Sequence, residues 1–309
     1  MKTSEVTTTV AVGSGASIQD RVAAAPISWG VCEVPGWGHQ MGVERVLTEM
    51  RAAGIVATEL GPDGFLPGPA REKASVLAAH GLRAVGGFVP VVLHEPMRDV
   101  MDTVGPALDA LVAAAATTIV LSADSGLPAS AGYDERVEPD RDGWKTLFAN
   151  LDRIRDTAAE RGITATLHPH VGTVVERPGE VDRVLTGSQI PLCLDTGHLL
   201  IGGTDPAELA GDVPDRIAHT HLKDVDSGFA ERVRAGELTY SAAVRAGMYR
   251  PLGRGDVDIT AIVSVLQAYG YDGWYVMEQD TILDAEPAPG EGPSQDVRAS
   301  LAFLAGIPA

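Results

Sequence analysis

The sequence predicts a single (β/α)8 barrel, an α/β fold of the TIM-barrel class, and three observations support this prediction. Short apolar runs alternate with segments whose apolar residues recur at helical spacing, and glycines close most of the helical segments. Polar and reactive residues follow the ends of most predicted strands, which is where such a barrel carries its active site. A chain of 309 residues is long enough for one such domain.

Eight candidate strands follow one another along the chain, each short and rich in apolar or β-branched residues. They cover residues 23–29, 55–60, 83–89, 118–122, 164–168, 192–195, 217–222 and 273–278. Strands that alternate with helices pair in parallel, because a parallel pair needs a crossover connection. An open doubly wound sheet is the alternative arrangement. The first strand–helix turns contain no GxGxxG or P-loop pattern, so the closed barrel is favoured.

The helical pattern is clearest over residues 42–54. The apolar residues Val43, Val46, Leu47 and Met50 fall on one helical face, and Gly54 follows as a C-terminal stop. The same pattern with a closing glycine recurs over residues 69–81, 143–162 and 259–270. These segments are the crossover helices that the predicted barrel requires.

The chain is predicted to contain one folded domain. Its first residues are polar and rich in Thr, Ser and Gly, so we expect a flexible lead-in over residues 1–20 and a single catalytic barrel over residues 21–309. Residues 225–256 are longer than a plain strand–helix loop and contain two short helical patterns, at 229–237 and 240–248. We predict that they form an insertion over the mouth of the barrel.

The composition restricts the partners and the compartment. The net charge of −18 repels phosphate backbones and anionic lipids, so we expect neither a nucleic-acid partner nor a membrane partner. The N-terminal segment lacks the apolar run of a signal peptide, and no stretch is apolar enough to span a bilayer. Cys32 and Cys193 lie far apart and suggest no disulfide framework. These features predict a cytoplasmic protein.

Titratable side chains gather at the ends of the last four predicted strands. In chain order they are His168, His170, Asp195, His198, His219, His221, Lys223 and Glu278. Residues two apart in a strand share a face, and the strand ends of a barrel meet at one mouth. A single histidine at a strand end usually has a structural role. Five histidines in one quadrant, beside two carboxylates, favour a metal site.

We expect this site to bind one divalent metal ion. The predicted ligands are His168, Asp195, His221 and Glu278. Two neutral imidazoles and two carboxylates balance a 2+ charge. The mixed nitrogen and oxygen ligands suit Mn²⁺, Co²⁺, Fe²⁺ or Zn²⁺ better than Mg²⁺, which prefers oxygen ligands alone.

Proton transfer beside the metal requires side chains whose pKa lies near the working pH. The candidates are His198, His170, His219, Glu59 and Lys223. The sequence does not rank them, and Glu59 could equally cap the Gly/Pro-rich turn that follows it. Three residues of the loop after the first strand are candidates for substrate binding, namely Trp29, Glu33 and Trp37. Tryptophan in such loops also serves packing alone.

Several longer motifs resemble those of the inosose dehydratase family, within the xylose-isomerase-like barrel superfamily. They are PISWGVCEVPGWGHQ (26–40), TELGPDGFLPG (58–68), LHPHVGT (167–173), LCLDTGHLLIGG (192–203), HTHLKDVD (219–226), PLGRGDVDI (251–259) and GYDGWYVMEQD (270–280). LDTGH and HxKD are shared across the superfamily, whereas WGVCEVPGWG and HPHVGT are narrower. The resemblance runs from about residue 23 to the C-terminus.

This resemblance implies a metal-dependent dehydration of 2-keto-myo-inositol to a trihydroxycyclohexane-1,2-dione in inositol catabolism. It implies the same four metal ligands, and a contact of His198 with a substrate oxygen. The related ketose epimerases have a glutamate at the position of His168 and use it with the strand-8 glutamate as a pair of bases. This chain keeps only Glu278 of that pair, which disfavours epimerisation. Pro169 interrupts the three successive histidines common in the dehydratases, so either His168 or His170 can be the ligand.

Other functions stay open at this stage. The same metal site would serve a ketose isomerase or epimerase, or an elimination on another keto-sugar or keto-glycoside. An endonuclease IV-like repair enzyme is disfavoured by the net charge of −18, and a non-catalytic sugar-binding barrel is disfavoured by the intact ligand set. A homo-oligomer is an open expectation, because barrels of this type often form dimers or tetramers.

Overall fold

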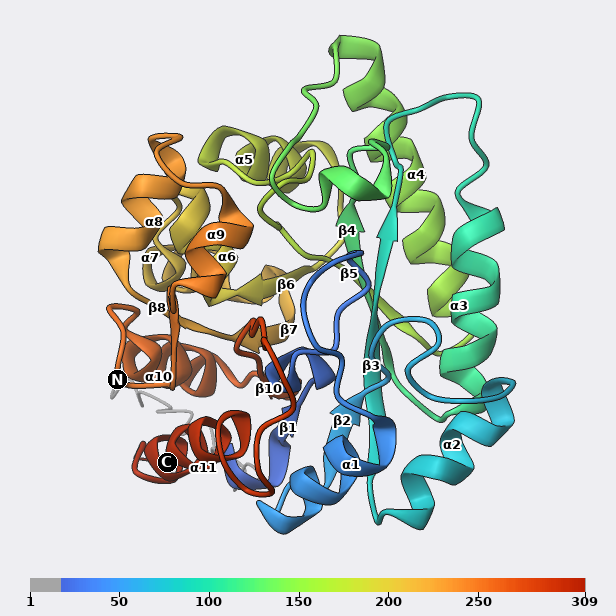
Figure 1. Cartoon of the computed structure of the whole chain (residues 1–309). Coiled ribbons are helices and arrows are strands. Elements are labelled where there is room, and N and C mark those ends of the chain that lie inside the picture. The colour runs from blue at the N-terminus through green and yellow to red at the C-terminus, as the bar shows by residue number, and fades with distance from the viewer. Residues whose placement is uncertain (1–17, 309) are drawn as a thin grey trace, which may run out of the picture.

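Eight parallel strands close into a barrel surrounded by helices in the computed structural model, which describes residues 18–308 (Figure 1). Around the barrel the strands follow the order β1-β10-β7-β6-β5-β4-β3-β2. They are β1 (Val22–Ala24), β2 (Ala57–Glu59), β3 (Arg83–Val91), β4 (Thr118–Ala123), β5 (Thr164–Leu167), β6 (Leu192–Asp195), β7 (Ile217–Leu222) and β10 (Tyr275–Met277). The predicted eight strands and the closed barrel are therefore confirmed.

The first strand is shorter than predicted. It ends at Ala24, and a 3-10 helix, η2 (Pro26–Trp29), replaces the second half of the predicted segment 23–29. Pro26 begins η2 because its ring fixes φ and removes the N–H that a strand would need. Gly30 ends it with φ of 77°, a left-handed conformation that suits glycine. This turn changes the direction of the chain just before the loop that reaches the barrel mouth.

Helices cover the outside of the barrel. They are α1 (Val43–Ala52), α2 (Ala70–Ala79), α3 (Met101–Ala113), α4 (Arg141–Glu160), α5 (Pro178–Gly187), α6 (Thr196–Gly202), α7 (Pro206–Asp212), α10 (Ile259–Tyr269) and α11 (Pro293–Ala305). Short 3-10 helices lie at η1 (Ile18–Arg21), η3 (Ala129–Ala131) and η4 (Pro214–Arg216). The predicted apolar face of α1 is confirmed, because Val46, Leu47 and Met50 are fully buried and Val43 packs against the core while partly buried. Within residues 18–308, none of the helices combines the length and the apolar character needed to cross a membrane.

The insertion after β7 forms a small unit at one end of the barrel. It contains α8 (Ser227–Arg234) and α9 (Tyr240–Arg245), as its two helical patterns predict. A two-stranded antiparallel sheet of β8 (Asp224–Val225) and β9 (Tyr249–Arg250) joins its two ends. Figure 1 shows α8 and α9 in orange beside α6 and α7.

Two further features concern the chain ends and the surface. Residues 1–17 of the predicted lead-in lie outside the described residues, whereas 18–20 belong to η1, where Ile18 is buried.

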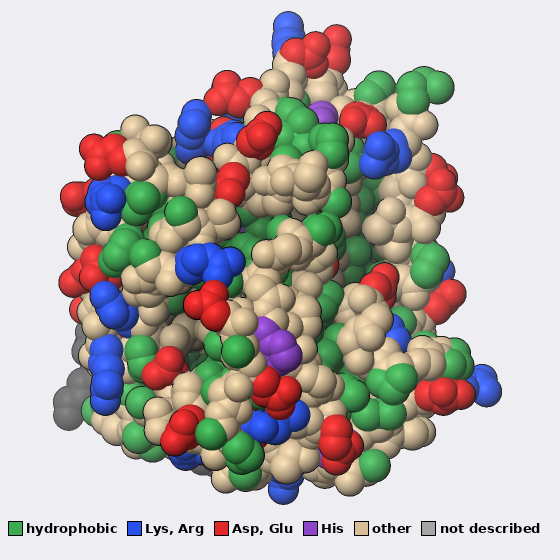
Figure 2. Space-filling model, in the orientation of Figure 1, with side chains coloured by type: hydrophobic (Ala, Val, Ile, Leu, Met, Phe, Trp, Pro, Cys, Tyr) green, Lys and Arg blue, Asp and Glu red, His purple; other side chains and the backbone are tan. Residues whose placement is uncertain are grey.

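On the face shown in Figure 2, basic side chains are interspersed among acidic ones and form no continuous stripe.

Asp224 anchors the turn that closes the insertion. Its carboxylate accepts hydrogen bonds from five backbone N–H groups, those of Val225, Gly253, Arg254, Gly255 and Val257. The backbone approaches so closely that a Cβ atom on Gly255 would lie 2.3 Å from Asp224 Oδ1. The PLGRGDVD motif is thus a backbone cradle for one buried carboxylate.

Replacing Asp224 by alanine is expected to lower the free energy of unfolding by about 3 kcal/mol, because several N–H groups lose their acceptor. Urea denaturation followed by circular dichroism measures this change. Asp212→Ala, which removes an exposed carboxylate at the end of α7, is the matched control. A loss below about 1 kcal/mol for Asp224→Ala would contradict the anchoring role.

Candidate metal centre and active site

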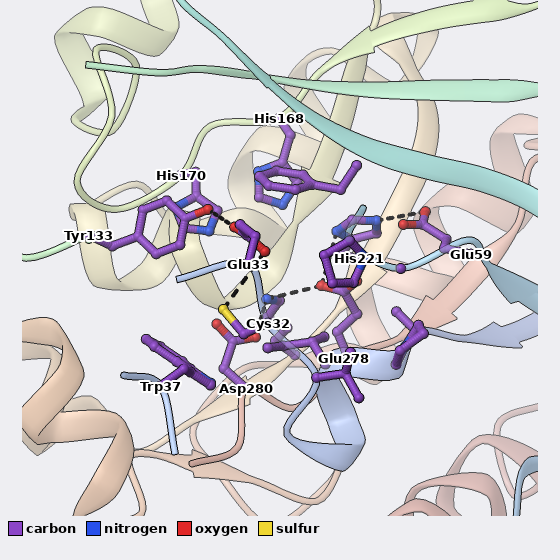
Figure 3. Close-up of a pocket in the computed structure, with 18 residues that line it drawn as sticks. Cys32, Glu33, Trp37, Glu59, Tyr133, His168, His170, His221, Glu278 and Asp280 are labelled. Atoms are coloured by element: carbon purple, nitrogen blue, oxygen red, sulfur yellow. Dashed lines mark hydrogen bonds and ion pairs between the residues drawn. The ribbon is translucent and has the colours of Figure 1, made fainter. Parts of the chain in front are cut away.

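The four predicted metal ligands come together, fully or almost fully buried, at the carboxyl ends of adjacent strands. Figure 3 shows three of them, His168, His221 and Glu278, around one pocket. His168 Nε2 lies 3.0 Å from Asp195 Oδ2, and His221 Nδ1 lies 3.6 Å from the same oxygen. His221 Nδ1 also lies 3.2 Å from Glu278 Oε2. The parallel register sets Asp195 opposite His221 and explains why the two side chains meet. Asp195 and His221 therefore link all four residues into one cluster, which we call the ligand cluster.

Ligand atoms of the cluster and of its neighbour His198 form two overlapping groups of three. Asp195, His221 and Glu278 place theirs within 4.8 Å of one another, and so do His168, Asp195 and His198. Asp195 belongs to both groups. Two other such groups share His221, one with Glu59 and His219 and one with His168 and Cys193.

The charges of the ligand cluster fit a divalent cation. Burial opposes ionisation of Asp195 and Glu278, but neighbouring cationic groups hold the pKa of both carboxyls below the usual value. Burial lowers the pKa of His168, so its imidazole is neutral and can act as a ligand. The buried Nδ1 atoms of His168 and His221 have no hydrogen-bond partner among the described residues. Two anionic carboxylates and two imidazoles match the preferences of Mn²⁺, Co²⁺, Fe²⁺ or Zn²⁺.

Glu59 supports the ligand cluster from the opposite side of the barrel. Its Oε1 lies 2.8 Å from His219 Nε2 and 3.0 Å from His221 Nε2. Although burial favours the neutral acid, His221 and His219 lower the pKa of Glu59, which is therefore a carboxylate. Burial opposes the charged form of His221, but Cys193, Glu278 and Glu59 beside it raise its pKa well above the usual value. A metal ion bound at Nδ1 would therefore displace a proton, while the Nε2 proton is donated to Glu59. A carboxylate behind a ligating histidine is a common way to fix its tautomer and orientation.

Replacing Glu59 by glutamine is expected to weaken metal binding by about 10- to 100-fold, because His221 loses the carboxylate that orients it. Titration of the metal-free protein with Mn²⁺ or Co²⁺ measures the dissociation constant. Glu44→Gln, on the exposed face of α1, is the matched control and should not change it. Unchanged metal affinity in Glu59→Gln would refute this supporting role.

Lys223 places a buried ammonium group between the ligand cluster and the insertion. Its Nζ lies 3.0 Å from Glu278 Oε2, 3.5 Å from Asp195 Oδ2 and 2.5 Å from Asp280 Oδ1. Burial acts against the charged form, but these carboxylates raise the pKa of Lys223 well above its usual value. Asp280 also accepts a hydrogen bond from Tyr240 of α9. The insertion therefore helps to fix Lys223.

His170 and His198 form a close, tilted ring pair beside the ligand cluster, with ring centroids 3.6 Å apart. His170 Nδ1 lies 2.7 Å from the carbonyl oxygen of Val171, which can only accept a hydrogen bond. The Nδ1 proton is therefore fixed, and Nε2 carries the lone pair. Burial lowers the pKa of His170 well below its usual value, so the ring is neutral at pH 7. Lys223 Nζ lies 3.2 Å from His198 Nε2.

A pocket of about 570 Å³ opens beside the ligand cluster. Of the predicted site residues it is lined by His168, His221, Glu278, His170, Glu59, Lys223, Glu33 and Trp37. Asp195, His198 and His219 are buried behind this lining. His219 is held by Glu59 and does not reach the pocket, so the structure separates it from the other candidates for proton transfer.

Trp29 does not belong to the pocket, and this corrects its prediction as a substrate contact. Its side chain is fully buried, and Nε1 donates a hydrogen bond of 2.9 Å to Glu49 Oε2. The 3-10 turn η2 places Trp29 against α1. Trp29 is therefore a packing residue.

Several residues that line the pocket were not predicted from the sequence, among them Asp280, Tyr133 and Phe88. Asp280 follows Glu278 by two residues, and the strand alternation that paired His168 with His170 could have found it. Tyr133 lies on the loop after β4, and its ring centroid lies 4.2 Å from that of His170. The local sequence around Tyr133 and Phe88 contains no pattern that indicates their position.

Comparisons with known proteins agree with this architecture. The family model described as "Xylose isomerase-like TIM barrel" matches residues 33–306. An inosose dehydratase of Lacticaseibacillus casei is 31% identical over 83% of this chain and 88% of that protein. The rhizopine catabolism protein MocC of Rhizobium meliloti is 33% identical over 87% of this chain and 84% of that protein.

A solved structure shares the same fold. The probable 3-DHS dehydratase AsbF of Bacillus anthracis superposes with a TM-score of 0.66 at 14% identity, covering 93% of this chain and 100% of that one. At this identity the likeness concerns the fold alone.

Proposed function

Since the chain belongs to the xylose isomerase-like TIM-barrel family, we propose that it is a metal-dependent carbon–oxygen lyase. The proposed reaction removes water from 2-keto-myo-inositol (inosose) and yields a trihydroxycyclohexane-1,2-dione. One observation carries the proposal: a single pocket is lined by residues of the ligand cluster, by the neutral imidazole of His170 and by the ammonium group of Lys223. The similarity to an inosose dehydratase at 31% identity supports the choice of substrate.

His168, Asp195, His221 and Glu278 would hold the metal ion, for which Mn²⁺ or Co²⁺ is our first choice and Fe²⁺ or Zn²⁺ the alternative. When bound, such an ion supplies Lewis acidity that polarises the substrate ketone. Because its lone pair lies on Nε2, His170 can remove the proton on the carbon next to the ketone. The electron pair of that C–H bond then becomes the double bond of an enolate.

Two residues would complete the elimination. The ammonium group of Lys223 stabilises the negative charge that develops on the substrate oxygens, as a fixed donor in a buried site does. The imidazolium of His170 can return its proton to the departing β-hydroxyl, which leaves as water. The remaining enol then tautomerises to the second ketone. Glu33 and Trp37, at the pocket wall, are proposed to bind the substrate ring.

The test is incubation of the Mn²⁺- or Co²⁺-loaded protein with 2-keto-myo-inositol while the ultraviolet absorbance of the enolised dione is followed. We expect the absorbance to grow, and removal of the metal with a chelator should abolish the growth. Readdition of metal should restore it, because the reaction depends on the polarised ketone. Absence of product with metal bound would refute the proposal. Exchange of the α-proton with solvent without loss of water would indicate an isomerase or epimerase instead.

A further inference from the structure

A second pocket of about 520 Å³ adjoins the active-site pocket, and the two share the side chains of Glu33 and Tyr133. The Tyr133 hydroxyl donates a hydrogen bond to the Glu33 carboxylate. We call this contact the divider, because both pockets are lined by the two side chains that form it. Figure 3 shows the divider on the side of the active-site pocket opposite Glu59.

The backbone around Tyr133 is held in place by neighbouring loops, whereas the divider itself is a contact between two side chains. A Cβ atom on Gly172 would lie 2.4 Å from the Tyr133 carbonyl oxygen, so the β4 loop is packed tightly against the β5 loop. On the other side, the Asp134 carboxylate accepts hydrogen bonds of 2.8 and 2.6 Å from the N–H and hydroxyl groups of Ser241. The Glu33 side chain, by contrast, is exposed. Of the two side chains of the divider, Glu33 is therefore the less confined.

The lining of the second pocket favours hydroxyl donors and disfavours anions. It contains the carboxylates of Glu33 and Asp124, and none of its lining residues is Lys or Arg. Asp124 Oδ1 accepts a hydrogen bond of 2.6 Å from the N–H of Gly126, and a carboxylate has further lone pairs for other donors. Leu127 and three prolines supply apolar surface for C–H groups. A phosphate group would be repelled by both carboxylates.

We propose that the second pocket is a subsite for a neutral, hydroxylated substituent such as a sugar unit. The enzyme would then accept cyclic polyhydroxy ketones that carry such a group, with the ketone at the ligand cluster. On binding, Glu33 would exchange the Tyr133 hydroxyl for hydroxyl groups of the substituent. This inference rests on the proposed function, since it extends the range of substrates of the same site.

The test compares two ligands without a ketone, myo-inositol and its galactosyl derivative 1-O-α-D-galactosyl-myo-inositol. Isothermal titration calorimetry on the Mn²⁺-loaded protein gives both dissociation constants. We expect the galactosyl derivative to bind about tenfold more tightly, because it adds hydrogen bonds to Glu33 and Asp124. Ala129→Trp, which fills the second pocket, should remove this gain. Ser130→Trp, on the neighbouring exposed residue of η3, is the matched control and should keep it.

Two results would overturn the subsite. One is equal affinity of the wild type for both ligands, and the other is the same tenfold gain in Ala129→Trp. An inositol monophosphate that bound more tightly than inositol would overturn the exclusion of anions. The outcome is separable from that of the dehydratase assay, because calorimetry needs no turnover. Failure of 2-keto-myo-inositol to react would refute the proposed function. The two dissociation constants would still show whether the second pocket binds the galactosyl group.

Discussion

Replacement of His221 by alanine is expected to abolish both metal binding and turnover. His221 is the residue that connects the ligand cluster, because its Nδ1 faces Asp195 and Glu278 while its Nε2 faces Glu59. Its loss removes one ligand and leaves these buried carboxylates without their shared partner. We expect turnover to fall by at least about a thousandfold, which corresponds to the several kcal/mol that a Lewis acid contributes.

Metal analysis after gel filtration and the absorbance assay measure the two effects in the same preparation. His80→Ala is the matched control, because His80 caps α2 and its Nε2 lies 3.1 Å from Glu44, outside the site. The control should keep its metal and a turnover within about twofold of the wild type. Stoichiometric metal in His221→Ala would show that the ligand assignment is wrong, and so would wild-type turnover.

Replacement of Lys223 by methionine is expected to separate turnover from metal binding. Methionine keeps most of the volume of the side chain and removes the ammonium group that lies 3.0 Å from Glu278. We expect turnover to fall by roughly 10²- to 10³-fold, the usual effect of losing one fixed donor to a developing oxyanion. Metal binding should persist or become tighter, because Asp195 and Glu278 lose a cationic competitor.

The same two assays check this prediction, with Lys145→Met as the control on the exposed face of α4. Lys223→Arg is a second comparison, since a guanidinium keeps the charge but differs in shape and should restore part of the turnover. Turnover within about threefold of the wild type in Lys223→Met would refute the catalytic role. Loss of the metal together with turnover would show that Lys223 maintains the cluster instead of acting on the substrate.

The barrel is predictable from the sequence because its determinants are local. Buried strands need runs of apolar residues, helices need the 3.6-residue spacing and their ends need glycine, and each feature occupies a few consecutive residues. The prediction for β1 was wrong in its second half. Residues 23–29 have the composition of a strand, but Pro26 begins the 3-10 helix η2 and Gly30 ends it. Because the strand ends of the barrel converge, the candidate site residues that follow β5, β6, β7 and β10 lie close together.

The roles of individual site residues depend on contacts between distant parts of the chain. Glu59 and His221 are 162 residues apart in sequence and lie 3.0 Å apart in space, so no local pattern could show that Glu59 supports a histidine. Lys223 and Asp280 are 57 residues apart and are joined to Tyr240 of the insertion.

The sequence by itself determined the fold class and the order of the elements. It also predicted that His168 or His170, Asp195, His221 and Glu278 gather at one mouth of the barrel, because alternation along parallel strands indicates which side chains share a face. The tertiary structure alone decided which residues reach the pocket. It moved Trp29 into the core, placed Glu59 behind His221 and set Glu33 against Tyr133. Loop direction and side-chain packing determine these contacts, and both depend on the whole folded chain.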